Sequence, residues 1–386
     1  MKKKTIPSQE QGKTQAYNRK KNNALVLSIL TQEPSSGTML SSKLGLSNSA
    51  LSGILGGLRR MGVIAEEVRV STSGRGRKQV RYCVNGNFGL IVVVAIANYQ
   101  AKITISNIKK ETLAATAVEV SRYDVQAVYG IVCSISSLLM EERFRPIPLK
   151  EIVICWPGRV NSKTGELAVS PQFDPDLFAD KDFLVREFGK LFKDANIFVN
   201  NDIKFALLGE KQFGALQKVD DAMLLSLDNG IGGAMLLRGE CFLGEQGYAG
   251  EFGLLKTNFE GKEMVLDEFA SLRALKLHFK EKLGREIHFK DLLSLYQEDA
   301  EAKGYILSTA RGVGRVLYSC SCLLDVTKIL LSGRVKEFGE DYRKAVEGEF
   351  LDPCYAPDVS YSTLEDAVGL GATSYGVSHA LKDAIE

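Results

Sequence analysis

The sequence has no apolar run long enough to cross a bilayer. Its longest apolar stretch, FGLIVVVAIANY, falls short of the roughly 20 residues that a membrane-spanning helix needs. The basic start, MKKKTIPSQEQGKTQ, is not followed by the apolar core of a secretory signal. We therefore expect a cytoplasmic chain without membrane contact, in which residues 1–21 form a flexible basic leader.

Residues that build disulfides or hold metals are also sparse. Seven cysteines, an odd number, are scattered at positions 83, 133, 155, 241, 320, 322 and 354. The one close pair, in YSCSCLL, stands in an apolar helix-like run with no histidine nearby, so small buried side chains are the better interpretation. This usage is typical of reduced thiols. We expect His278, His288 and His379 to be surface or packing residues, and the chain to hold no metal.

The net charge of +2 hides an uneven distribution. Residues 1–87 contain fifteen Lys and Arg against four Asp and Glu, a net charge of +11, and the remainder carries −9. A basic head on an acidic body is typical of a chain whose head binds a polyanion. A basic solvated tail is the alternative, because Lys2–Lys4 and Arg19–Lys21 supply six of the fifteen cations.

Residues 22–87 show the pattern of three helices followed by a hairpin. The apolar segment NNALVLSILTQE and the short SSGTMLSSKLGL come first, and an apolar stripe at helical spacing then runs through SNSALSGILGGLRRMG. Ser47 is a natural N-cap for this third helix, and Gly62 ends it before two β-type runs. The order predicts a winged helix-turn-helix, whose third helix enters the DNA major groove.

The outward residues of the third helix are suited to contacts with DNA. Asn48, Ser49 and Ser52 lie there; Asn can bond a base edge at two places, and Ser can bond bases or phosphates. Gly53, Gly56 and Gly57 favour a close approach, either of DNA or of a neighbouring helix.

The tip between the two β-type runs, SGRGRK, carries Arg75, Arg77 and Lys78. Arginine suits the narrow, negative minor groove of A/T-rich DNA, and the R-G-R core resembles an AT-hook in which Lys78 replaces the usual proline. We expect these three residues to contact DNA; a winged helix that docks a protein is the alternative.

Residues 88–386 mix strands with helices, as an α/β architecture does. Several segments, WPGRV, VNNDIKFALLGE, LDNGIGGAMLLRGECFLGEQGYAGEFG, LDEFAS and LLDVTKILLSGRV, occur in the order in which the ROK family (repressors, open reading frames, sugar kinases) carries them. From about Tyr17 onward the chain resembles the repressor branch of that family. The resemblance implies a two-lobed, actin-like ATPase body of ribonuclease H-like fold with a sugar cleft between the lobes. Residues 88–205 plus 366–386 would form the first lobe, and residues 206–365 the second.

The phosphate loops depart from the pattern of the family's kinases. Their first loop reads roughly Asp-x-Gly-Gly-Thr, but here Ala95 stands in place of the Asp and Asn98, Tyr99 and Gln100 replace small residues. In the second loop, DNGIGG, Asp228 would repel phosphate, and an Asn-Gly hairpin turn accounts for most of the segment. We therefore expect no phosphoryl transfer and no cofactor.

The sequence matches the family more closely at the sugar-contact residues than at the phosphate loops. It implies sugar contacts at Gly158, Gln172, Asn201, Asp202, Glu251 and Asp267. Asp202 matches the family's catalytic base, which without ATP can simply hold a sugar hydroxyl. Gln172 and Asp267 stand where the family usually has Asn and Glu. Leu254 replaces a family histidine, and the segment LKTNFEGKEMV lacks the family's zinc-binding cysteines, so no structural zinc is implied.

These observations predict a transcriptional regulator, a repressor, rather than an enzyme. It would bind operator DNA as a homodimer or tetramer, and a sugar or sugar phosphate in the interlobe cleft would shift the DNA affinity. Two alternatives are open: a sugar kinase with a DNA-binding head, and a regulator that has lost sugar binding and answers a partner protein.

Overall fold

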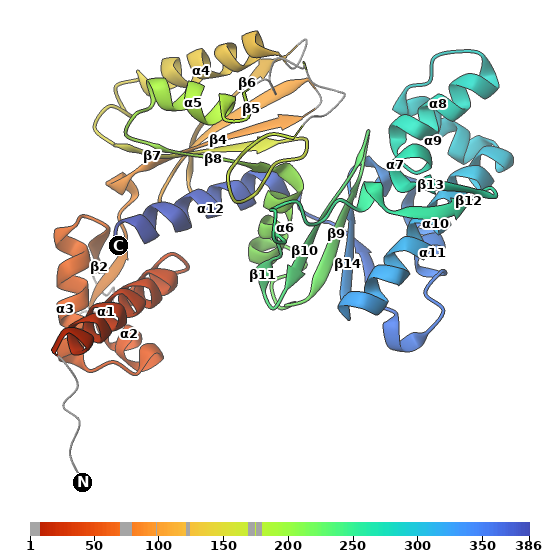
Figure 1. Cartoon of the computed structure of the whole chain (residues 1–386). Coiled ribbons are helices and arrows are strands. Elements are labelled where there is room, and N and C mark those ends of the chain that lie inside the picture. Colours follow the sequence, from red (N-terminus) through yellow and green to blue (C-terminus); the bar gives the residue numbers. More distant parts are fainter. Residues whose placement is uncertain (1–7, 70–78, 98, 121–123, 169–173, 175–179) are drawn as a thin grey trace.

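A computed structural model of the chain describes residues 8–69, 79–97, 99–120, 124–168, 174 and 180–386. A small N-terminal head, residues 8–87, precedes two α/β lobes, each built on its own five-stranded sheet (Figure 1). Among the described residues, no helix has both the length and the apolar character needed to cross a membrane.

The head has the order of elements that the sequence predicts. They are α1 (Ser8–Leu30), β1 (Ser35–Ser36), α2 (Gly37–Leu44), α3 (Asn48–Arg60), β2 (Ile64–Arg69) and β3 (Gln79–Val84). β3 pairs with both β1 and β2, so a three-stranded antiparallel sheet completes the helix-helix-helix-hairpin plan. Ser47 caps α3 as expected, because its hydroxyl accepts a hydrogen bond from the Ala50 N–H at 3.2 Å.

The expectation of a flexible leader over residues 1–21 is wrong for residues 8–21, which belong to α1. This segment is rich in Gln and Lys, which are good helix formers, and no proline follows Pro7 within it. The C-terminal half of α1 buries Val26, Leu27 and Leu30 in the head. Packing of that half supports the helix that extends from it.

The first lobe carries a mixed sheet. Its elements are β4 (Leu90–Ala97), β5 (Gln100–Asn107), β6 (Thr112–Glu119), α4 (Val125–Leu139), β7 (Leu149–Trp156), α5 (Phe183–Leu191) and β8 (Asn196–Asn201). The strand order is β6-β5-β4-β7-β8, with β4 to β6 antiparallel and β7 and β8 added in parallel. Helices α4 and α5 cover one face (Figure 1), where Ile131, Ile135 and Phe188 join the apolar core.

The second lobe repeats this topology. Its sheet consists of β9 (Ala222–Leu227), β10 (Ile231–Leu237), β11 (Glu240–Cys241), β14 (Lys328–Ser332) and β15 (Asp358–Tyr361), in the order β11-β10-β9-β14-β15. The remaining main elements are β12 (Lys256–Phe259), β13 (Lys262–Val265), α7 (Leu266–Phe269), α8 (Leu272–Leu283), α9 (Phe289–Glu298), α10 (Ala300–Leu324) and α11 (Gly339–Glu347). Two copies of one mixed sheet confirm the predicted two-lobed, actin-like body.

Two helices cross between the lobes. α6 (Asp202–Phe213) follows the last strand of the first sheet and packs against β9 and β10 of the second, whereas α12 (Ala367–Asp383) follows β15 and packs against β4 and β7. Their backbones touch: a Cβ on Gly209 would lie 2.1 Å from the Ala367 carbonyl oxygen, and one on Gly371 would lie 1.9 Å from that of Phe205. Glycine at both positions therefore permits the crossing that joins the lobes.

Candidate DNA-binding face and interlobe site

The first turns of α3 present the predicted polar residues to solvent. Asn48, Ser49 and Ser52 are all exposed. Two glycines of this helix have space around them. A Cβ on Gly53 would meet no described atom within 4 Å, so this position is open to a ligand, whereas one on Gly57 would lie 3.6 Å from Arg19 Nη2 of α1.

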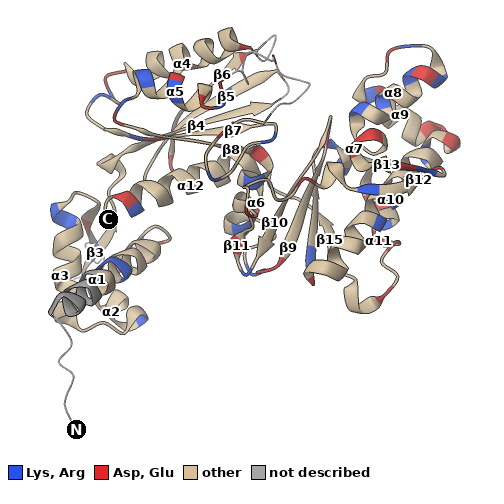
Figure 2. Ribbon diagram, viewed as in Figure 1, with Lys and Arg blue, Asp and Glu red and all other residues tan. Residues whose placement is uncertain are grey.

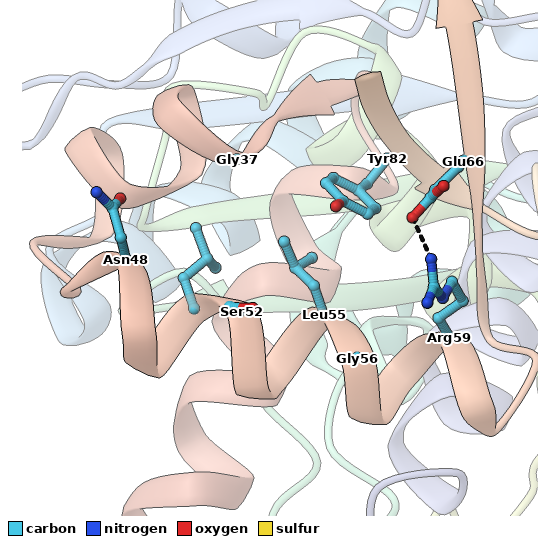
Figure 3. A pocket seen from close by; sticks show the side chains of 9 residues that line it. Gly37, Asn48, Ser52, Leu55, Gly56, Arg59, Glu66 and Tyr82 are labelled. Atoms are coloured by element: carbon cyan, nitrogen blue, oxygen red, sulfur yellow. Dashed lines mark hydrogen bonds and ion pairs between the residues drawn. The ribbon is translucent and has the colours of Figure 1, made fainter. Parts of the chain in front are cut away.

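A shallow pocket of about 250 Å³ lies along the same helix, between α3 and the strands of the hairpin (Figure 3). Asn48 and Ser52 line one end, and Arg59, Glu66 and Tyr82 line the other. Arg59 forms an ion pair with Glu66, which fixes the hairpin against the end of α3. The polar residues in the first turns of α3 therefore lie at the edge of this pocket.

Basic residues occur on all three helices of the head. Lys and Arg lie on α1, α2 and α3 in Figure 2, and Arg19, Lys20 and Lys21 of α1 are exposed. The predicted contacts Arg75, Arg77 and Lys78 lie outside the described residues, between β2 and β3.

In the body, the first candidate residues meet where β8 passes into α6. Asn201 caps α6, because its Oδ1 accepts from the Ile203 N–H at 3.0 Å. Its Nδ2 donates to the Gly158 carbonyl oxygen at 2.9 Å, which ties the loop after β7 to the start of α6. The structure thus brings Gly158 and Asn201 together, with Asn201 positioning the backbone next to Asp202.

Asp202 opens α6 with a carboxylate in an unusual electrostatic setting. Its Oδ1 accepts from the Ile203 N–H at 2.9 Å. Although part of the side chain reaches solvent, the burial of its carboxylate, assisted by the negative charge of Asp228, raises the pKa of Asp202 to about 7. Such a group accepts a hydrogen bond from a sugar hydroxyl when ionised and donates one when protonated.

Glu251 is accompanied by a residue that the sequence interpretation missed, the buried Lys204. Burial raises the pKa of Glu251, while the cations Arg159 and Lys204 act in the opposite direction. Lys204 Nζ donates to Ser162 Oγ at 2.6 Å and to the Gly247 carbonyl oxygen at 2.8 Å. It therefore connects α6 to loops of both lobes, close to Glu251. A lysine amid the apolar residues of VNNDIKFALLGE was the available signal.

Asp267 has a structural task in the second lobe. Its Oδ1 accepts from the Ile231 N–H at 2.9 Å, and its Oδ2 pairs with Arg273 Nη2 at 2.5 Å. The residue thereby fixes the glycine-rich turn between β9 and β10, and both of its carboxylate oxygens have protein partners. Gln172, the remaining predicted sugar contact, lies outside the described residues.

The two turns expected to differ from phosphate loops carry other groups at the expected positions. Ala95 lies beside Cys155 in the parallel β4–β7 pairing, so no carboxylate stands at that position. Tyr99, in the turn between β4 and β5, is exposed and has a positive φ of 59°. In the second turn, Asp228 is paired with Arg334 at 2.5 Å.

A cavity of about 850 Å³ lies between Tyr99 of the first lobe and the second lobe. Asn229, Lys276, Phe289 and Arg334 are among its lining residues. Lys276 Nζ donates to Asn229 Oδ1 at 2.9 Å. Arg334 is thus paired with Asp228. Lys276 is hydrogen-bonded to Asn229, in the same turn as Asp228.

The segment that corresponds to the family's zinc cluster forms the β12–β13 hairpin. Lys256 and Glu263 make an ion pair at 2.7 Å across it. Leu254, at the position of the family histidine, is 52% exposed just before the hairpin. Backbone pairing of β12 with β13 and the Lys256–Glu263 ion pair thus connect the two strands of this hairpin.

Comparison with known proteins identifies the family to which the chain is similar. A family model described as "ROK family" matches residues 93–373. The xylose repressor of Caldicellulosiruptor bescii is 23% identical over 392 residues, which cover 93% of this chain and 96% of the repressor. The β-glucoside kinase of Listeria monocytogenes is 31% identical over 193 residues, or 48% of this chain, and the match spans only 64% of the kinase.

A solved structure has the same fold over nearly the whole chain. It is a ROK family transcriptional regulator, a homologue of the Escherichia coli Mlc protein, with a TM-score of 0.80 and 22% sequence identity. The likeness covers 95% of this chain and 97% of that one, so the shared fold includes the head as well as the lobes.

Proposed function

The chain belongs to the ROK family, and from that premise we propose that it is a sugar-responsive transcriptional repressor rather than an enzyme. The observation that carries the proposal is the head, where α3 exposes Asn48, Ser49 and Ser52 on its first turns. A helix with exposed polar residues at its N-terminal end, followed by a β-hairpin, fits the major groove. The relatives that match along most of the chain, such as the xylose repressor, support the same assignment.

The effector in this proposal is a sugar or sugar phosphate at the junction of the lobes. Asp202 and Glu251 would accept hydrogen bonds from its hydroxyl groups. Lys204 would transmit the binding of the sugar from one lobe to the other, because it donates hydrogen bonds to Ser162 of the first lobe and Gly247 of the second. A ligand that favours one lobe angle would shift the spacing of two heads in a homodimer or tetramer, and so the operator affinity.

The phosphate turns argue against a kinase. Ala95 offers no carboxylate for a metal ion, and the ion pair of Asp228 with Arg334 occupies the second turn. Phosphoryl transfer from ATP needs a metal ion and a cradle for the phosphates, which these two turns would have to supply. Because a β-glucoside kinase is among the relatives, a sugar kinase is the second candidate function. An assay of sugar-dependent ADP release distinguishes the two candidates.

The test begins with ligand binding to the purified full-length protein. A thermal-shift screen against sugars, sugar phosphates and Mg-ATP should give a shift in melting temperature with one sugar class. The shift should be measurable, because a ligand at a hundred times its Kd stabilises a fold by about 2.7 kcal/mol. Asp202→Asn should abolish this shift. A shift with Mg-ATP would contradict the proposal, and the absence of any shift would favour a regulator controlled by a partner protein.

DNA binding is tested separately. The full-length protein should select a common, two-fold symmetric site from a library of random duplexes, and the effector from the screen should change the affinity for that site, measured by fluorescence anisotropy. Failure to select any sequence, with the protein folded, would overturn the DNA-binding role while leaving the sugar-binding role intact.

A further inference from the structure

A cluster of ligand-type side chains lies at the amino ends of β7 and β8, away from the interlobe site and the DNA-binding face. Glu151 comes from β7, and His379 and Asp383 come from successive turns of α12. Each offers one ligand atom, and these three atoms lie within 4.8 Å of one another. His379 Nδ1 is 3.2 Å from Glu151 Oε1 and 3.6 Å from Asp383 Oδ2.

Glu151 is the unusual member of this cluster. The residue is fully buried in the sheet, and its Oε1 accepts from Asn196 Nδ2 at 3.2 Å. Its other oxygen, Oε2, is buried and has no hydrogen-bond partner among the described residues. A buried carboxylate oxygen without a partner is costly, and a cation coordinated by both carboxylate oxygens of Glu151 would satisfy it. A proton shared between His379 and the two carboxylates would still leave Oε2 without a partner.

We propose that Glu151, His379 and Asp383 bind a divalent transition-metal ion. One imidazole nitrogen and two carboxylate oxygens suit Zn²⁺ or Mn²⁺. Metal–ligand bonds of about 2.0–2.1 Å in a tetrahedral site place ligand atoms roughly 3.3 Å apart, close to the separations of His379 Nδ1 from both carboxylates. The two negative charges match the charge of the ion.

The surroundings of the cluster orient the ligands and leave a path for the ion. Asn196 Nδ2 also donates to Asp383 Oδ2 at 2.8 Å, so one amide bridges both carboxylates. The ring of His379 packs edge-on against Phe198 at a centroid distance of 4.3 Å. The side chains of His379 and Asp383 are 28% and 45% exposed, which opens the cluster to solvent on the α12 side.

The position of the cluster gives the ion a structural role. Directly after Asp383, the residues Ala384 and Ile385 pack into an apolar cluster that also contains Val84 of the head and Phe88, which follows the head. An ion bound by two residues of the last turns of α12 would therefore hold that end of the helix to the sheet, next to the junction of head and body.

Titration of the full-length protein with Mn²⁺, followed by electron paramagnetic resonance, tests the proposal. Thiolates prefer softer ions, so Mn²⁺ reports on nitrogen and oxygen ligands despite the free cysteines. We expect His379→Gln and Asp383→Asn each to lose one equivalent of bound Mn²⁺ or to bind it at least tenfold more weakly, and Zn²⁺ to displace that equivalent from the wild type.

His288→Gln is the matched control, because His288 lies outside the cluster, and it should bind as the wild type does. Asp383 is partly exposed, so Asp383→Asn should fold even if a change at Glu151 does not. The proposal is overturned if the wild type binds no Mn²⁺ or Zn²⁺, or if both variants bind these ions as tightly as the wild type.

Discussion

Arg334 holds Asp228 in a two-point ion pair across the carboxyl ends of two neighbouring parallel strands. The guanidinium Nη2 lies 2.5 Å from Asp228 Oδ1, and Nε lies 3.1 and 3.2 Å from the two carboxylate oxygens. The pairing of β9 with β14 places the turns after these strands side by side. Arg334 also stacks over the ring of Phe289 at 4.9 Å. The turn after β9 is thereby tied to the turn after β14 by protein charges.

This pair leads to a prediction about phosphoryl transfer. With Mg-ATP and a panel of sugars, the wild-type chain should release no sugar-dependent ADP, because Ala95 supplies no metal ligand and the Asp228–Arg334 ion pair occupies the second turn. A coupled assay of ADP measures this, with the Listeria monocytogenes β-glucoside kinase as the positive control. Sugar-dependent ADP release that disappears in Asp202→Asn would contradict the prediction.

Asp228 and Arg334 also show how far the sequence could lead. Asp228 was recognisable from DNGIGG as an unsuitable residue for a phosphate turn. Its partner was not identified, because LLSGRV shows only that Arg334 follows a strand. That β14 lies next to β9 is a property of the sheet order, which joins residues about a hundred positions apart. Pairing across parallel strands depends on topology rather than on local pattern.

The raised pKa of Asp202 predicts a specific dependence of stability on pH. The folded carboxyl titrates near pH 7, against an ordinary value of 3.8, so between about pH 4 and pH 7 the folded state binds more protons than the unfolded state. The contribution of Asp202 to the free energy of unfolding therefore falls as the pH rises through this window and is constant above it.

Asp202→Asn removes this titration, so the variant should gain stability relative to the wild type between pH 5 and pH 8. Urea denaturation at the two pH values measures the difference. An equal difference between variant and wild type at both pH values would show that the carboxyl has an ordinary pKa.

Because α6 and α12 cross so closely, one added methyl group at the crossing should lower the stability of the fold strongly. In Gly371→Ala the new Cβ would overlap the Phe205 carbonyl oxygen, so the helices must separate, and we expect the free energy of unfolding to fall by at least about 2 kcal/mol. Gly304→Ala in α10 is the control, because the position is exposed and a Cβ there would meet no described atom within 4 Å. It should raise stability by about 0.5–1 kcal/mol. Equal effects in urea denaturation would refute the tight crossing.

The head was more predictable from the sequence than the interlobe site. The stripe of Leu51, Ile54, Leu55 and Leu58 is local, and all four side chains are buried as a helical period requires. Lys204 was missed because a lysine usually reaches solvent, and only the loops that fold over α6 bury it. The helical start of α1 was missed because its support comes from packing further along the same helix.

Substitutions in α3 and in the hairpin tip should affect contacts with different grooves of the DNA. Asn48→Ala should cost about 1–3 kcal/mol of operator binding and relax the preference at one base pair, because the proposed complex has Asn48 bonded to a base edge in the major groove. The double change Arg75→Ala and Arg77→Ala should instead weaken binding most on operators with A/T-rich flanks, since arginine favours a narrow minor groove. Anisotropy titrations on operators that differ only in their flanks measure both effects. If the double variant loses the same affinity on A/T-rich and G/C-rich flanks, these arginines contact phosphates and do not read the minor groove.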